Sequence, residues 1–193
     1  MSDAAAFSRS LAEQAPEGSL LLALSGGLDS ALLLHLLIKA GLGPRLSAVH
    51  IDHQLQADSQ DWARFCQSLA DQQGISLAIE KVAVDMGNGL EAGARDARYR
   101  VLLPLARAQG ATLVMAHHRN DQAETLLFRL LRGAGVQGLS AMRKYSEQQG
   151  VPLWRPLLGV GRQTLESWGA ALSLNWREDP SNQDQSLRRN YLR

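Results

Sequence analysis

The chain contains a single cysteine, Cys66, among its 193 residues. One thiol cannot form an internal disulfide or supply the paired cysteines of zinc and iron–sulfur sites. No apolar run approaches the roughly 18 residues of a membrane span, and residues 1–18 lack the basic start and apolar centre of a signal peptide. We therefore expect a cytoplasmic protein without a membrane partner, and a buried, unreactive thiol.

Neither sign of charge dominates the sequence, which has 20 Lys and Arg, 19 Asp and Glu, and 45% hydrophobic residues. This composition is typical of globular proteins, and the length favours one domain. Residues 1–118 hold 9 basic and 12 acidic side chains, whereas residues 119–193 hold 11 and 7. The basic later part is compatible with a polyanionic partner, although ordinary surfaces show similar differences.

The stretch 20–30 reads LLLALSGGLDS and precedes an apolar segment that ends at Gly41. This pattern predicts a buried strand, a tight turn and a helix. Two glycines let the backbone approach a ligand closely, and a helix N-terminus attracts anions, so a phosphate is the expected guest. The carboxylate of Asp29 would need a metal ion or an amine beside it. The turn matches neither the Walker spacing nor Gly-x-Gly-x-x-Gly, and an ordinary strand-to-helix turn is the simpler alternative.

Alternation of apolar and helical segments predicts strands near residues 20–24, 46–52, 75–82, 111–116 and 152–158. The expected fold is α/β: a doubly wound, mainly parallel, Rossmann-like five-stranded sheet with helices on both faces. In such a sheet the loops after the first and fourth predicted strands meet at a topological switch point. This geometry would bring Asp29 close to Asp121, which could instead serve only to cap a helix.

Two further segments are candidates for contacts with phosphate or substrate. Arg95, Arg98 and Tyr99 fall on one face of a predicted helix. Such a pair of arginines could bind phosphate bidentately, although the spacing fits a solvated face equally well. The glycine-rich stretch 133–139 is a candidate lid or substrate-binding loop.

Together these segments resemble the tRNA(Ile)-lysidine synthetase family of PP-loop ATP pyrophosphatases, which cleave ATP between its α and β phosphates. The resemblance runs from about Leu20 to Arg193 and includes SGGLDS, VHIDH, EAGARDARY, DQAET, RGAG, RPLL, EDPSN and RNYLR in that order. Two positions depart from it: Asn120 stands where the family usually has aspartate, and Gln54 where it usually has glycine. The first departure removes one candidate ligand charge for a metal ion.

The resemblance implies that residues 1–193 form a PP-loop catalytic domain and that further tRNA-binding domains are absent from this chain. It implies a reaction of ATP, with Mg²⁺, at the wobble cytidine of tRNA-Ile with a CAU anticodon. The cytosine O2 attacks the α-phosphate, and the amine of free L-lysine then expels AMP from C2. The implied catalytic residues are Asp29, Asp121 and Arg95, with Asp29 and Asp121 also the metal ligands. The implied binding residues are Ser25, Gly26, Gly27, Leu28, Asp29, Ser30, His50, Asp52 and His117 for the nucleotide, and Arg98, Arg132, Gly133, Gly135 and Arg189 for tRNA.

Two alternatives stay open on the sequence. The first is another PP-loop enzyme, a tRNA thiolase or an amide-forming synthetase; the missing cysteine pairs argue against an iron–sulfur thiolase. The second is a nucleotide-binding module without catalysis, against which the intact Asp29 and Asp121 argue. The sequence leaves the oligomeric state open, including a homodimer.

Overall fold

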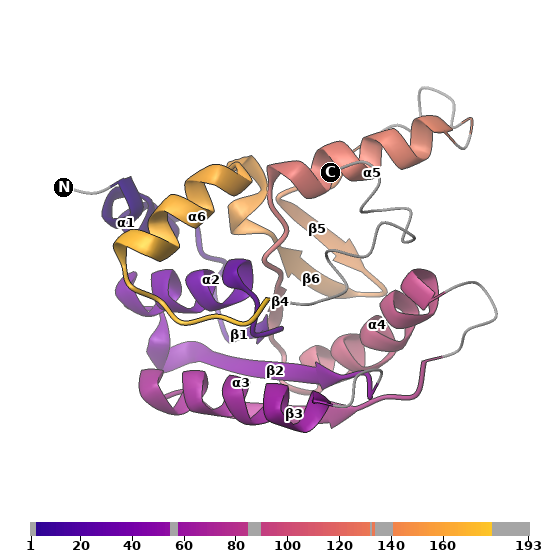
Figure 1. The fold of residues 1–193 in the computed structure, drawn as a ribbon, viewed down its shortest axis with the longest axis horizontal. Coiled ribbons are helices and arrows are strands. Elements are labelled where there is room, and N and C mark those ends of the chain that lie inside the picture. The colour runs from indigo at the N-terminus through magenta and orange to yellow at the C-terminus, as the bar shows by residue number, and fades with distance from the viewer. Residues whose placement is uncertain (1–2, 55–57, 85–89, 132, 134–140, 179–193) are drawn as a thin grey trace.

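The computed structural model describes residues 3–54, 58–84, 90–131, 133 and 141–178 (Figure 1). Its sheet has six strands in the order β3-β2-β1-β4-β6-β5, and only β5 runs antiparallel to its neighbour. The strands are β1 Leu20–Ala23, β2 Leu46–Asp52, β3 Leu77–Lys81, β4 Thr112–Val114, β5 Tyr145–Gln148 and β6 Val151–Trp154. The predicted doubly wound α/β class is confirmed.

The predicted count of five strands is wrong, because the sequence pattern gave no indication of β5. Its residues YSEQ are polar and none of them is buried. An edge strand pairs on one side only and needs no apolar face. A two-residue turn joins it to β6, with positive φ at both Gln149 (50°) and Gly150 (78°), as a type I′ hairpin requires.

Helices cover both faces of the sheet (Figure 1). The side chains of Leu20 and Leu22 pack with buried residues of α1, α2, α3 and α6, whereas Leu21 packs with α4 on the opposite face. This division follows from the alternation of side chains along a strand. The helices are α1 Asp3–Gln14, α2 Leu28–Lys39, α3 Ser59–Gln73, α4 Leu90–Ala108, α5 Arg119–Leu131 and α6 Arg162–Ala171, with 3₁₀ turns η1 Gly43–Arg45 and η3 Pro156–Gly159.

The strand order places the switch point between β1 and β4. These two strands are hydrogen-bonded neighbours, with Leu22 opposite Val114, although β2 and β3 separate them in the chain. The loop after β1 and the turn after β4 therefore leave the same edge side by side. This arrangement, predicted from the alternating pattern, decides where the functional site lies.

Helix α5 extends from this edge away from the sheet (Figure 1). Its leucines are partly solvent-exposed, from 37% for Leu126 to 74% for Leu131. Within the described ranges, no helix has both the length and the apolar character that crossing a membrane requires.

Candidate active site

The SGGLDS segment forms the turn between β1 and α2, and Ser30 organises it. The Ser30 hydroxyl oxygen accepts the backbone N–H groups of Ser25 at 3.1 Å and Gly26 at 3.2 Å, and donates to the Gly27 carbonyl at 3.1 Å. Gly26 has φ +82°, and a Cβ there would lie 2.7 Å from Nε1 of Trp62. The turn therefore needs glycine at this position for both conformation and space.

The carbonyl oxygens of the turn are held by donors from other segments. The Leu24 carbonyl accepts from Nδ1–H of His50 at 2.9 Å, and the Ser25 carbonyl accepts from the indole N–H of Trp62. The Gly26 carbonyl accepts from the backbone N–H of Arg177 at 3.0 Å. The first N–H groups of α2 have no partner within the helix. With its carbonyl groups engaged elsewhere, the turn can present these donors to an anion.

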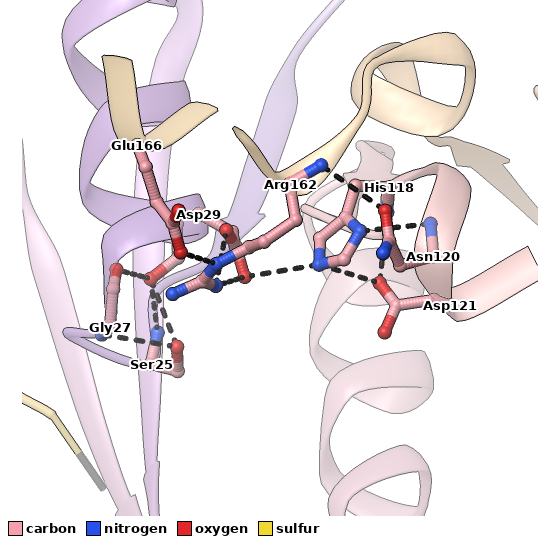
Figure 2. A network of polar contacts seen from close by, with 9 residues as sticks. Ser25, Gly27, Asp29, His118, Asn120, Asp121, Arg162 and Glu166 are labelled. Atoms are coloured by element: carbon pink, nitrogen blue, oxygen red, sulfur yellow. Dashed lines mark hydrogen bonds and ion pairs between the residues drawn. The ribbon is translucent and has the colours of Figure 1, made fainter. Parts of the chain in front are cut away.

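A network of charged side chains crosses the switch point (Figure 2). Nη1 of Arg162, the first residue of α6, donates to both carboxylate oxygens of Asp29 at 3.0 and 3.1 Å. Nε2 of His118 lies 3.6 Å from Oδ2 of Asp29 and 3.7 Å from Oδ2 of Asp121. The structure thus brings Asp29 and Asp121 to one place, as the sequence predicted, with a histidine between them.

The tautomer of His118 follows from its own hydrogen bond. The backbone N–H of Asn120 donates to Nδ1 at 3.2 Å, so Nδ1 is an acceptor and Nε2 carries the proton. The side chain is 3% exposed. His118 therefore presents a fixed N–H to both carboxylates.

Asp121 and Asn120 both stabilise helix ends. Oδ2 of Asp121 accepts the backbone N–H of His118 at 2.9 Å, which is the return half of a capping box at the start of α5. Oδ1 of Asn120 accepts the backbone N–H of Arg162 at 3.2 Å, so this side chain holds the first turn of α6. The Asn120 side chain therefore has a capping role, which does not require a charge.

His117, the predicted nucleotide ligand, lies on the α4 side of the same edge. Burial chiefly, together with the positive charges of Arg98, Arg155 and Arg95, lowers its pKa to about 3, although Asp121 opposes this shift. The guanidinium groups of Arg95 and Arg98 lie 5.1 and 5.9 Å from the ring centre of Tyr99. His117 is therefore neutral at physiological pH.

The structure adds two basic residues to which sequence reasoning gave no role, although Arg155 belongs to the RPLL segment of the family resemblance. Arg162 had no motif to indicate it, because its contact with Asp29 joins α2 to α6. Arg155 follows β6 and is only 6% exposed, with Nη1 donating to the Arg143 carbonyl at 3.0 Å and the Ser146 hydroxyl at 2.7 Å. His118 follows His117 directly in the sequence, but the sequence-based prediction assigned only His117 to the nucleotide and gave His118 no role.

His50 and Asp52 lie at the carboxyl-terminal part of β2, and both are buried. His50 supports the turn through Leu24, and burial lowers its pKa. Asp52 accepts the backbone N–H of Gln54 at 2.9 Å. Gln54 has φ +53°, a left-handed conformation that explains why glycine suits this position in the family it resembles.

Of the predicted tRNA-binding residues, Arg132, Gly135 and Arg189 lie outside the described residues. Gly133 follows α5 with φ +72°. At 1.5 Å per residue, the helix separates it from Asp121 by roughly 18 Å.

The described residues could bind Mg²⁺ only together with a bound substrate that supplies the remaining ligands. They contain no group of three or more His, Cys, Asp or Glu side chains that could hold a metal ion. Mg²⁺ is usually held by one or two carboxylates together with substrate phosphates. Asp29 and Asp121, beside an anion-binding turn, match that donor set.

Residues 2–193 match a family model described as a PP-loop domain. The chain is 48% identical over 188 residues to the tRNA(Ile)-lysidine synthase of Pseudomonas aeruginosa, covering 96% of this chain and 42% of that protein. It is also 48% identical to the tRNA(Ile)-lysidine synthase of Haemophilus influenzae, covering 94% and 43%. The chain thus spans less than half the length of these curated relatives.

Solved structures resemble the fold at lower identity. The U34-tRNA thiolase NcsA of Methanococcus maripaludis, with its [4Fe-4S] cluster, has a TM-score of 0.74 at 17% identity, over 92% of this chain and 66% of the other. The NH3-dependent NAD synthetase of Campylobacter jejuni has a TM-score of 0.60 at 15% identity, over 90% and 75%. At such identities the likeness concerns the fold alone.

Proposed function

This chain belongs to the PP-loop domain family, and from that membership and the site geometry we propose that it performs the chemistry of a tRNA(Ile)-lysidine synthase. Membership implies ATP binding. The finer proposal is that ATP, held with Mg²⁺, adenylates the wobble cytidine of tRNA-Ile with a CAU anticodon, and that free L-lysine then displaces AMP. The observation that carries it is the network of Asp29, His118 and Asp121 beside the phosphate-binding turn.

The first step is attack of the cytosine O2 on the α-phosphate, which breaks the bond to the β-phosphate and releases pyrophosphate. The donors at the start of α2 would hold the leaving pyrophosphate. Asp29 and Asp121 would hold Mg²⁺, which would supply positive charge against the charge that develops on the phosphates. Arg95 and Arg98 lie with neutral His117 on the α4 side of this edge, where they would bind anionic parts of the nucleotide or tRNA.

The second step requires a neutral amine, but the lysine ammonium has a pKa of about 10.4. Nε2 of His118 already carries its proton, because the Asn120 N–H occupies Nδ1. His118 therefore cannot accept the proton at the atom that faces the site. We assign that role to Asp29 or Asp121, which would first bind the ammonium and then take its proton as C2 is attacked.

Mass spectrometry of tRNA-Ile with a CAU anticodon tests the whole reaction. The RNA is incubated with this chain, ATP, Mg²⁺ and lysine, and the Pseudomonas aeruginosa relative serves as the positive control. We expect a lysyl group on the wobble cytidine together with AMP, and an adenylated cytidine when lysine is omitted. AMP formation without any change to this tRNA would instead favour a different PP-loop ligase.

Because the chain spans under half of its curated relatives, we further propose that it is the catalytic domain and that tight tRNA binding needs additional sequence. The expected sign is a high KM for tRNA with kcat largely retained. An Asp29→Asn variant tests the amine step separately, using tRNA that already carries the adenylate. We expect lysine transfer to fall by about 100-fold or more; unchanged transfer would assign the proton acceptor elsewhere.

A further inference from the structure

Arg162 holds Asp29 from across the site. Both oxygens of the Asp29 carboxylate accept from one nitrogen of Arg162, Nη1, while Nε of Arg162 donates to Glu166 at 2.8 Å. Figure 2 shows the Arg162 side chain lying between the turn at Ser25 and Gly27 and the His118 ring. The guanidinium group thus stands where a phosphate bound by the turn would meet the two carboxylates.

The contact is not required to dock α6 on α2. Apolar side chains already join these helices: Leu165 is fully buried, Trp168 is 8% exposed, and a Cβ at Gly169 would lie 2.6 Å from Leu28 Cδ1. The Arg162 side chain itself is 38% exposed. An ion pair this exposed contributes little to stability, so its placement calls for another explanation.

The surroundings of Arg162 favour an anionic ligand. The N-termini of α2, α5 and α6 meet at this point, since Asp29, His118 and Arg162 stand at or beside the starts of these three helices. Helix N-termini favour negative charge. A guanidinium group binds phosphate oxygens in a fork, as it binds a carboxylate.

We propose that Arg162 is a phosphate-binding residue of this site, which exchanges the Asp29 carboxylate for the pyrophosphate portion of the bound nucleotide. The exchange leaves the Asp29 carboxylate available to bind the metal ion or the lysine ammonium. Nucleotide binding would therefore prepare this carboxylate for the second step. This inference rests on the ATP chemistry proposed above. It adds a residue outside the turn to the phosphate-binding donors.

Binding of inorganic pyrophosphate, measured by titration calorimetry in EDTA, tests the exchange without catalysis or metal. We expect Arg162→Gln to weaken binding by about 10- to 100-fold, as the loss of charge-assisted hydrogen bonds predicts. Arg9→Gln is the matched control, because Arg9 is an exposed arginine of α1 and takes no part in the network around Asp29. It should change affinity by less than about threefold, as expected for an exposed charge, and both variants should keep the wild-type midpoint of urea unfolding.

A double-mutant cycle with Asp29→Asn measures the competition itself. Loss of the carboxylate charge frees Arg162, so this variant should bind pyrophosphate more tightly than the wild type. In the Arg162→Gln background the gain should be clearly smaller. An equal gain in both backgrounds would mean that Arg162 takes no part, and would overturn the proposal.

Two other results would also overturn it. Unchanged pyrophosphate affinity with weaker lysine binding in Arg162→Gln would assign the residue to the amino acid. A lowered unfolding midpoint with an equal loss of AMP and pyrophosphate binding would make its role structural. Because pyrophosphate binding needs no tRNA, the exchange can be confirmed even if the lysidine reaction fails, and failure of the exchange leaves that reaction untouched.

Discussion

Oδ1 of Asn120 accepts the backbone N–H of Arg162 at 3.2 Å and so joins the first turn of α5 to the first turn of α6. Through this bond the turn after β4 fixes the helix that carries the guanidinium partner of Asp29. Asn120 stands where the family usually has aspartate, and the sequence alone suggested the loss of a metal ligand at this position. In the structure its side chain instead caps α6.

The Asn120 cap predicts the effect of two substitutions on stability. Asn120→Ala removes the acceptor for the Arg162 N–H and should lower the free energy of unfolding by about 0.5–2 kcal/mol. Asn120→Asp keeps an acceptor and should remain within a few tenths of a kcal/mol of the wild type. Urea unfolding followed by circular dichroism measures both. Equal stability of the alanine variant and the wild type would show that the cap is not formed.

The two glycines of the turn should respond differently to alanine. Gly26 has φ +82° and its Cβ would lie 2.9 Å from Sγ of Cys66, so Gly26→Ala should cost about 2–4 kcal/mol of stability. Gly27 has φ −76°, and its Cβ would meet nothing closer than 3.6 Å. Gly27→Ala should therefore fold normally, yet bind ATP roughly tenfold or more weakly, because the methyl group displaces the phosphate.

Calorimetric ATP titration and urea unfolding of both variants separate these effects. Normal stability of Gly26→Ala would contradict the packing described here. Wild-type ATP affinity in Gly27→Ala would mean that phosphate does not approach this part of the turn.

The low pKa of His117 predicts a loss of stability in acid. The folded-state pKa is about 3, below the ordinary histidine value of 6.5, so below pH 6.5 the unfolded chain binds a proton that the folded chain does not. Stability should therefore fall as the pH drops from 6.5 toward 3, by at most about 1.4 kcal/mol per pH unit from this residue. It should be unaffected by His117 above pH 6.5.

Urea unfolding at pH 7, 6 and 5 would compare the wild type with His117→Asn. The variant has no imidazole to titrate, so its stability should depend less on pH over this range. Parallel pH profiles would show that His117 titrates normally in the folded protein.

Cys66 should behave as an inert thiol. Burial raises its pKa to about 12, and its Sγ lies 3.4 Å from Nδ1 of His50 beneath the turn. Thiolate is the reactive form, so a disulfide reagent such as Ellman's should label the native chain far more slowly than the chain in urea. Rapid labelling of the native chain would show that Cys66 is accessible and reactive, and would contradict this prediction.

Local pattern was sufficient to predict much of this fold. Apolar runs and helical periodicity determined the alternation of strands and helices, which predicts a doubly wound sheet with a switch point. The strand order of the structure then shows that β1 and β4 are the neighbours at that point. The strand β5 escaped prediction because a polar edge strand leaves no periodic apolar signal.

The site divides in the same way. Residues of the SGGLDS turn are contiguous, so a shared role could be predicted from the sequence. The closeness of Asp29 to Asp121 was predicted from the expected doubly wound fold. Only the tertiary structure placed Arg162, 133 positions further along the chain, on Asp29, and put His118 rather than His117 between the two carboxylates. The orientation of His118 depends on the backbone N–H of Asn120, and the position of Arg162 depends on the packing of α6 against α2. Contacts between distant segments leave no local pattern in a single sequence.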